Sequence, residues 1–127
     1  MSLKFLTASL MAAALTGLAG AAEINLYSGR HYDGDAQLYA GFEAATGIKV
    51  NVIEGKTDEL LARIEAEGDA SPADVFFTAD AGNLWRAEDK GLLQPIESAA
   101  LTAAIPAEYR DPNNQWFGVS RRARIIF

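Results

Sequence analysis

The chain has 127 residues, with 11 lysines and arginines against 17 aspartates and glutamates, so its formal net charge is −6 at pH 7. This acidic balance argues against a nucleic-acid-binding protein, which normally carries a basic face. The chain has no cysteine. Disulfides and thiolate metal sites are therefore excluded, and any bound metal must be held by oxygen and nitrogen ligands.

The N-terminal segment has the features of a cleavable signal peptide over residues 1–21. Lys4 supplies a positive charge, residues 5–18 form an apolar stretch, and residues 19–21 give the small-x-small pattern that signal peptidase reads. The stretch is shorter than the roughly 20 apolar residues that span a bilayer. A membrane anchor and an ordinary alanine-rich helix are the alternatives. We expect export to the periplasm, with cleavage after Ala21 or after Ala22.

After this segment, short β-type runs alternate with helical ones. Three strands are predicted, at residues 24–28, 48–52 and 75–77. Three helices are also predicted. The first starts at Asp35, the second has Thr57 as its N-cap, and the third has Asp80 as its N-cap. Each is followed by a glycine that can end it, at Gly47, Gly68 and Gly91. This order predicts an α/β fold with a mostly parallel sheet flanked by helices.

The C-terminal part of the sequence has a different pattern. Residues 111–114 form a turn signal, and residues 116–127 are predicted to be β structure. The last three residues are the apolar Ile125-Ile126-Phe127, whereas domains usually end in exposed polar segments. We therefore expect residues 22–127 to be the first α/β lobe, incomplete, of a longer protein.

The first candidate site is the pair His31 and Tyr32, in the loop between the first strand and the first helix. Ligands of open α/β sheets bind beyond the carboxyl ends of the strands, where this loop lies. A neutral imidazole binds many metals, and a strongly charged cation stabilises the phenolate form of tyrosine. The alternative is that both are ordinary polar loop residues, because two adjacent residues cannot complete a coordination sphere.

The second candidate site is an arginine cluster near the C-terminus. Alternate residues on a strand share a face, so Arg122 and Arg124 point the same way and Arg121 points to the other side. Two guanidinium groups near a cleft can hold an oxyanion through forked hydrogen bonds. The alternative is a solvated edge strand whose charges discourage aggregation.

The aromatic and acidic residues outside these two sites favour structural roles. Trp85 and Trp116 are interpreted as packing residues and not as a sugar platform. Asp74 and Asp80 flank the third strand, and we interpret them as caps of a turn and a helix and not as a catalytic pair.

Five segments resemble periplasmic ferric-iron-binding proteins. The most specific is residues 24–32, INLYSGRHY, and the others are residues 46–50, 67–76, 91–95 and 116–124. The resemblance covers essentially all of the chain after residue 21. It implies a type II periplasmic-binding-protein fold, in which two α/β lobes joined by a hinge close around the ligand.

The resemblance also implies roles for particular residues. His31 and Tyr32 correspond to iron ligands, with Tyr32 typical of a tyrosine-rich branch of the family. Arg122 corresponds to an arginine that lies at the cleft and contacts the bound anion or the groups around the iron, and Arg124 is a second candidate. Ala79 stands where another branch has a glutamate ligand, which favours a site built mainly from tyrosines.

The remaining tyrosine ligands of the family come from sequence beyond residue 127. The other tyrosines of this chain, Tyr27, Tyr39 and Tyr109, match no ligand position. We therefore expect the chain by itself to bind ferric iron weakly.

The function that the resemblance implies is the periplasmic solute-binding component of an iron(III) ABC importer. It would bind Fe(III), with a synergistic anion such as carbonate, and deliver it to a permease in the inner membrane. We expect a monomer when full length, no nucleic-acid partner and no enzymatic activity. One alternative is a related periplasmic binder for an oxyanion or a small organic solute, using Arg122. Another is a secreted metal-dependent enzyme, for which Asp33 or Asp35 would be the general base.

Overall fold

The computed structural model describes residues 22–121. The predicted signal peptide at residues 1–21 lies outside the described residues, and so do Arg122 and Arg124. In the part of the chain that is described, no helix is long and apolar enough to cross a membrane.

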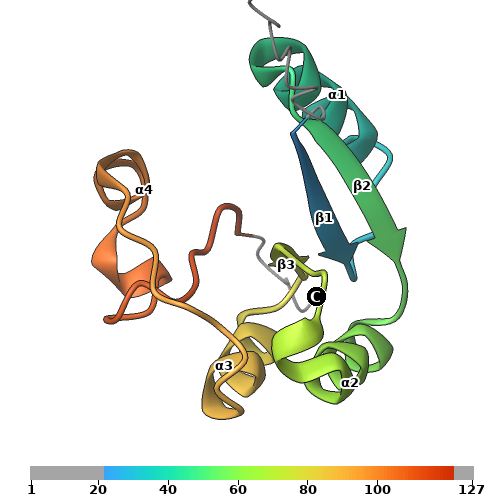
Figure 1. The fold of residues 1–127 in the computed structure, drawn as a ribbon. Helices are drawn as coiled ribbons and strands as arrows, with labels where there is room; N and C mark the ends of the chain where they lie inside the picture. The colour runs from blue at the N-terminus through green and yellow to red at the C-terminus, as the bar shows by residue number, and fades with distance from the viewer. Residues whose placement is uncertain (1–21, 122–127) are drawn as a thin grey trace, which may run out of the picture.

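Among the described residues, three parallel strands form a sheet in the order β2-β1-β3 (Figure 1). They are β1 (Glu23–Ser28), β2 (Lys49–Glu54) and β3 (Val75–Phe77). Ser28 at the end of β1 is paired with Glu54 of β2 and with Phe77 of β3. The three strands therefore end together, and the predicted parallel α/β arrangement is confirmed.

Within residues 22–121, four α-helices and two short 3₁₀ helices connect and follow the strands. They are α1 (Asp35–Thr46), α2 (Thr57–Glu67), η1 (Gly68–Ala70), α3 (Ala81–Asp89), α4 (Ala99–Ala104) and η2 (Ala107–Tyr109). The prediction for Asp80 is confirmed, because its carboxylate accepts a 2.7 Å hydrogen bond from the backbone N–H of Gly82. The prediction for Thr57 is wrong: Thr57 is already helical, and Lys56 stands at the N-cap position without a side-chain cap.

The core lies between the sheet and the helices α2 and α3. Leu26 and Tyr27 of β1 are buried, as are Leu60 and Leu61 of α2 and Ala87 of α3. The apolar side of α2 that contains Leu60 and Leu61 thus faces the sheet. Two ion pairs at the surface join α2 to α3, Asp58 to Arg86 and Glu65 to Lys90, each with an N–O distance of 2.6 Å.

Two predictions about apolar residues are not met. Helical spacing puts Leu38 and Phe42 on one face of α1, which predicts that they pack together, but they are 59% and 38% exposed. Trp85 was interpreted as a packing residue and is 58% exposed on α3. Trp116 does pack: it is half-buried, and its indole N–H donates a 2.7 Å hydrogen bond to Glu88.

The β structure predicted from residue 116 onward is not formed within residues 116–121. The only pairing there is an isolated antiparallel bridge between Arg110 and Phe117. The physical reason is a tight turn: the Asp111 carboxylate accepts the backbone N–H groups of Asn113 and Gln115. Across this turn, Asp111 donates its N–H to the carbonyl oxygen of Trp116 and Gly118 donates to that of Tyr109, so the pairing stays confined to a few residues on each side of the turn.

Candidate functional site

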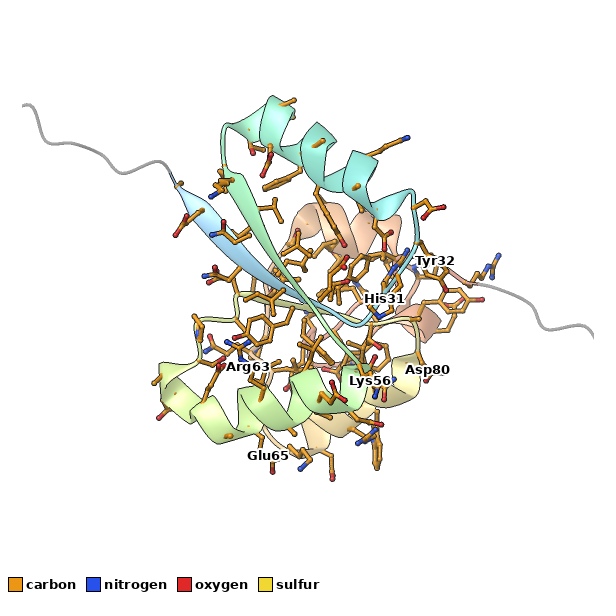
Figure 2. All side chains as sticks on the ribbon, turned by 90° about the vertical axis from the view of Figure 1, so that its right-hand side faces the viewer. His31, Tyr32, Lys56, Arg63, Glu65 and Asp80 are labelled. Atoms are coloured by element: carbon orange, nitrogen blue, oxygen red, sulfur yellow. The ribbon has the colours of Figure 1, made fainter. Side chains whose placement is uncertain are left out.

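The carboxyl ends of the three parallel strands lie at one end of the sheet. His31 follows β1, Lys56 follows β2 and Asp80 follows β3. Figure 2 shows these labelled residues on the same side of the molecule, whereas Arg63, near the end of α2, lies toward the opposite side. This is the position at which open α/β sheets bind ligands.

The backbone after β1 is held from both neighbouring strands. Gly29 donates its N–H to the carbonyl oxygen of Phe77 (2.8 Å), and Gly55 donates to the carbonyl oxygen of Ser28 (3.2 Å). A Cβ atom on Gly29 would lie 2.2 Å from the Thr57 hydroxyl oxygen. Only glycine fits this approach of α2. The backbone position of Gly29, where the loop between β1 and α1 begins, is therefore fixed.

His31 and Tyr32 lie exposed at this end of the sheet. The Tyr32 side chain is 46% exposed, and its backbone carbonyl accepts a 2.9 Å hydrogen bond from the N–H of Asp35, the first residue of α1. Together with neighbouring residues they line a hollow of about 420 Å³, which is formed by His31, Tyr32, Asp33, Asp35, Ala36 and Glu54. The two predicted ligands are therefore next to each other and accessible to an incoming ion.

Arg30 is the residue of this loop for which we predicted no separate role. Its guanidinium forms a forked ion pair with Asp35, with Nε–Oδ2 3.2 Å and Nη2–Oδ1 2.9 Å. The two side chains are only 14% and 12% exposed. The guanidinium carbon lies 4.2 Å from the ring centre of Phe77 and 4.9 Å from that of Tyr32. The only sequence signal for this arrangement is an acid five residues after the arginine, which is too common to be predictive.

The segment that precedes the predicted arginine site also reaches this loop. Nη1 of Arg30 lies 3.5 Å from the hydroxyl oxygen of Ser120. Arg121 turns to Tyr109, donating a 2.6 Å hydrogen bond to its phenol oxygen. Ser120, two residues before Arg122, is thus next to the loop that contains His31 and Tyr32.

The tyrosines that matched no ligand position have other contacts. Tyr27 is fully buried, and its hydroxyl donates to both carboxylate oxygens of Glu67, at 3.1 and 3.2 Å. Burial, and secondarily the hydrogen bond to Glu67, raise the pKa of the Tyr27 phenol. A buried phenol with a raised pKa is a poor source of a phenolate ligand.

The carboxylates of the described region do not form a metal site by themselves. Within residues 22–121, no group of three or more histidine, aspartate or glutamate side chains could hold a metal ion. Asp35, one of the two residues considered as a general base, is buried and paired with Arg30. This pairing favours a structural role for Asp35 over proton transfer.

A larger hollow of about 840 Å³ lies among β3, α3 and the segment 115–120. Most of its lining is apolar, including Leu61, Leu84, Leu92 and Phe117. Such a surface offers few ligands to a hard cation, which prefers oxygen donors. The smaller hollow at His31 and Tyr32 is therefore the better candidate for a metal-binding site.

Comparison with known proteins identifies the family. The bacterial extracellular solute-binding protein family matches residues 21–125. The chain belongs to this family. Iron uptake protein A1 from Synechocystis sp. is 58% identical over 104 residues, which are 82% of this chain and 29% of that protein. The major ferric iron-binding protein of Neisseria gonorrhoeae is 32% identical over 123 residues, 93% of this chain and 36% of that protein.

The solved structures agree with the fold. The FutA protein of Trichodesmium in complex with iron and citrate matches with a TM-score of 0.72 and 59% identity, over 75% of this chain and 30% of that one. The predicted type II periplasmic-binding-protein fold is thereby confirmed for this family member. The chain spans about three-tenths of the length of these first relatives.

Proposed function

We propose that this chain provides the first-lobe half of a ferric-iron site in the solute-binding component of an ABC importer. The observation that supports it most is the exposed pair His31 and Tyr32, on a loop fixed at the carboxyl end of the sheet. The names of the relatives, an iron uptake protein and a ferric iron-binding protein, support the same cargo.

In this proposal His31 supplies an imidazole nitrogen and Tyr32 a phenolate oxygen to Fe(III). Two ligands leave most of the coordination sphere open, so closure of a second lobe would supply the others. Arg122, with Arg124 as the weaker candidate, would hold a synergistic anion such as carbonate. The position of Ser120 beside Arg30 supports this role for Arg122. Ser120 is only two residues before Arg122 and lies next to the loop that contains His31 and Tyr32.

The remaining parts of the proposal concern the location, the oligomeric state and the partners of the protein. The protein would capture iron in the periplasm, act there as a monomer when full length and deliver its cargo to an inner-membrane permease. It would have no nucleic-acid partner and would be a binding protein and not an enzyme. The formal charge of −6 supports the exclusion of nucleic acid.

Substitution of Tyr32 tests the iron ligand. The test protein is a chimaera in which the matching 104 residues of iron uptake protein A1 are replaced by those of this chain. Tyr32→Phe removes one oxygen ligand and keeps the ring, so we expect ferric affinity to fall at least about 10–100-fold, with loss of part of the visible phenolate-to-iron colour. Competition with citrate, followed by absorbance, measures both.

Tyr109→Phe is the matched control, because Tyr109 is a partly exposed tyrosine whose hydroxyl contacts Arg121 and not the loop. It should leave affinity and colour unchanged. Unchanged iron binding in Tyr32→Phe would disprove the ligand role. Uptake of an oxyanion but no iron by the unsubstituted chimaera would favour the oxyanion-binding alternative.

Export is tested separately by the mass of the secreted product. We expect the mature protein to begin at Ala22 or Glu23, because small residues at positions 19 and 21 form the cleavage signal. Retention of residues 1–21 in a membrane fraction would contradict the proposed export.

A further inference from the structure

The guanidinium of Arg30 joins three separate parts of the molecule. It is paired with Asp35 at the start of α1, lies over the ring of Phe77 at the end of β3 and reaches Ser120 in the C-terminal segment. It also lies 4.9 Å from the ring centre of Tyr32, two residues along the chain. The Arg30 side chain is only 14% exposed.

The chemistry of the guanidinium suits this place. Its planar fork matches both oxygens of a carboxylate, and its faces are free to stack on aromatic rings. The Asp35 carboxylate fixes the plane of the fork, and Phe77 lies against it. Asp35 also donates its backbone N–H to the carbonyl oxygen of Tyr32. The pair of Arg30 and Asp35 therefore contacts both the backbone and the ring of Tyr32.

We propose that Arg30 is a positioning residue, which sets the orientation of the Tyr32 phenol for iron binding. The inference rests on the proposed function. It adds to that function a residue that orients the Tyr32 ligand before iron binds. The Arg30 guanidinium lies over the ring of Tyr32, and a phenol held in one orientation loses less conformational entropy when the metal binds.

Lysine separates this role from a general requirement for positive charge. Arg30→Lys keeps the charge but lacks the fork and the flat face that stacks on Tyr32 and Phe77. We therefore expect Arg30→Lys to weaken ferric binding by about tenfold or more in the chimaera, and to shift the phenolate-to-iron band.

A double-mutant cycle tests whether Arg30 acts through Tyr32. In a Tyr32→Phe background, Arg30→Lys should change iron affinity by no more than about twofold, because the ligand that it positions is gone. If the two losses multiply independently, Arg30 does not act through Tyr32 and the proposal is overturned. Ser120→Ala is a second check: a loss as large as that of Arg30→Lys would mean that Arg30 acts through the C-terminal segment.

A measurement without iron keeps this test separate from the proposed function. Tyrosines are labelled with ¹³C on the ring in the iron-free chimaera, and the Tyr32 signal is assigned by its absence in Tyr32→Phe. Arg30→Lys should shift that signal. Arg63→Lys is the matched control, because Arg63 lies 4.9 Å from the ring centre of Tyr27 and is paired with Glu67. It should shift the Tyr27 signal and leave the Tyr32 signal in place.

The outcomes are distinct for the two proposals. An unmoved Tyr32 signal in Arg30→Lys overturns the positioning role, whatever the iron measurements give. A moved signal together with a non-additive cycle supports it. If the unsubstituted chimaera binds no ferric iron, the proposed function fails, and with it the claim that the Tyr32 orientation serves iron binding.

Discussion

At the scale of single residues, the half-buried carboxylate of Glu67 at the end of α2 accepts hydrogen bonds from three side chains. It accepts hydrogen bonds from Tyr27, from Arg63 (2.7 Å) and from the hydroxyl of Ser71 (2.7 Å). The hydrogen bonds from Arg63 and then Ser71 lower the pKa of Glu67, against the opposing effect of burial. The ionised form of Glu67 is thus the form that the fold favours.

The lowered pKa of Glu67 makes stability depend on pH. A carboxyl group whose pKa is lower in the folded than in the unfolded state stabilises the fold above its unfolded pKa, and this contribution is lost as the pH falls through the folded pKa. Glu67→Gln should therefore lower the urea midpoint at pH 7. The difference from the unsubstituted chimaera should shrink as the pH falls below the usual range of a glutamate.

Glu65→Gln is the control for this prediction, since Glu65 is on the same helix and forms only a surface ion pair with Lys90. Such pairs contribute little, so we expect a small change in the urea midpoint. Equal effects of Glu67→Gln and Glu65→Gln at pH 7 would show that the hydrogen bonds to Glu67 do not stabilise the fold.

The contacts among the residues of the candidate site differ in how well they could be predicted from the sequence. His31 and Tyr32 stand next to each other in a recognisable motif, so their proximity in space follows from the chain itself. The pairing of Arg30 with Asp35 depends on the turn between them, closed by the hydrogen bond from the Asp35 N–H to the Tyr32 carbonyl. Contact with Ser120, 90 residues away, depends on the whole fold. No local pattern encodes either contact.

At the scale of elements, prediction succeeded where local signals and packing agree. The strand at Val75–Phe77 and the helix that follows it are found as expected, because an apolar run is followed by a capping aspartate and an amphipathic stripe. The end of α1 at Gly47 is also as expected, with φ of 71° in the left-handed region.

Prediction failed for two segments, one whose pairing depends on its neighbours and one with only a weak local signal. The apolar pattern after residue 116 resembles a strand, but within residues 116–121 the pairing is limited to one antiparallel bridge, between Arg110 and Phe117 across the turn at Asp111. The α4 helix, Ala99–Ala104, was not predicted; it is a short alanine-rich segment capped by the Ser98 hydroxyl, which accepts from the N–H of Leu101 (3.2 Å). A weak helical tendency becomes definite only with that cap.

At the scale of the whole molecule, a large amount of apolar surface is exposed. Leu38 of α1, Val75 of β3 and Trp85 of α3 are all more than two-fifths exposed, on three different elements. In the sheet that the described residues form, β2 and β3 are the outer strands, as Figure 1 shows. Exposed apolar surface and open strand edges both favour association between chains.

We therefore expect residues 22–127, produced by themselves, to self-associate, whereas the chimaera with iron uptake protein A1 should be monomeric. Sedimentation velocity over a range of concentrations distinguishes the two. Leu38→Lys should reduce the association, because it places a charge in the exposed apolar face of α1. Ala40→Lys adds the same charge on the same helix but removes no large apolar side chain, so its effect should be smaller. A single monomeric species of residues 22–127 at every concentration would show that the exposed residues are compatible with an isolated, soluble lobe.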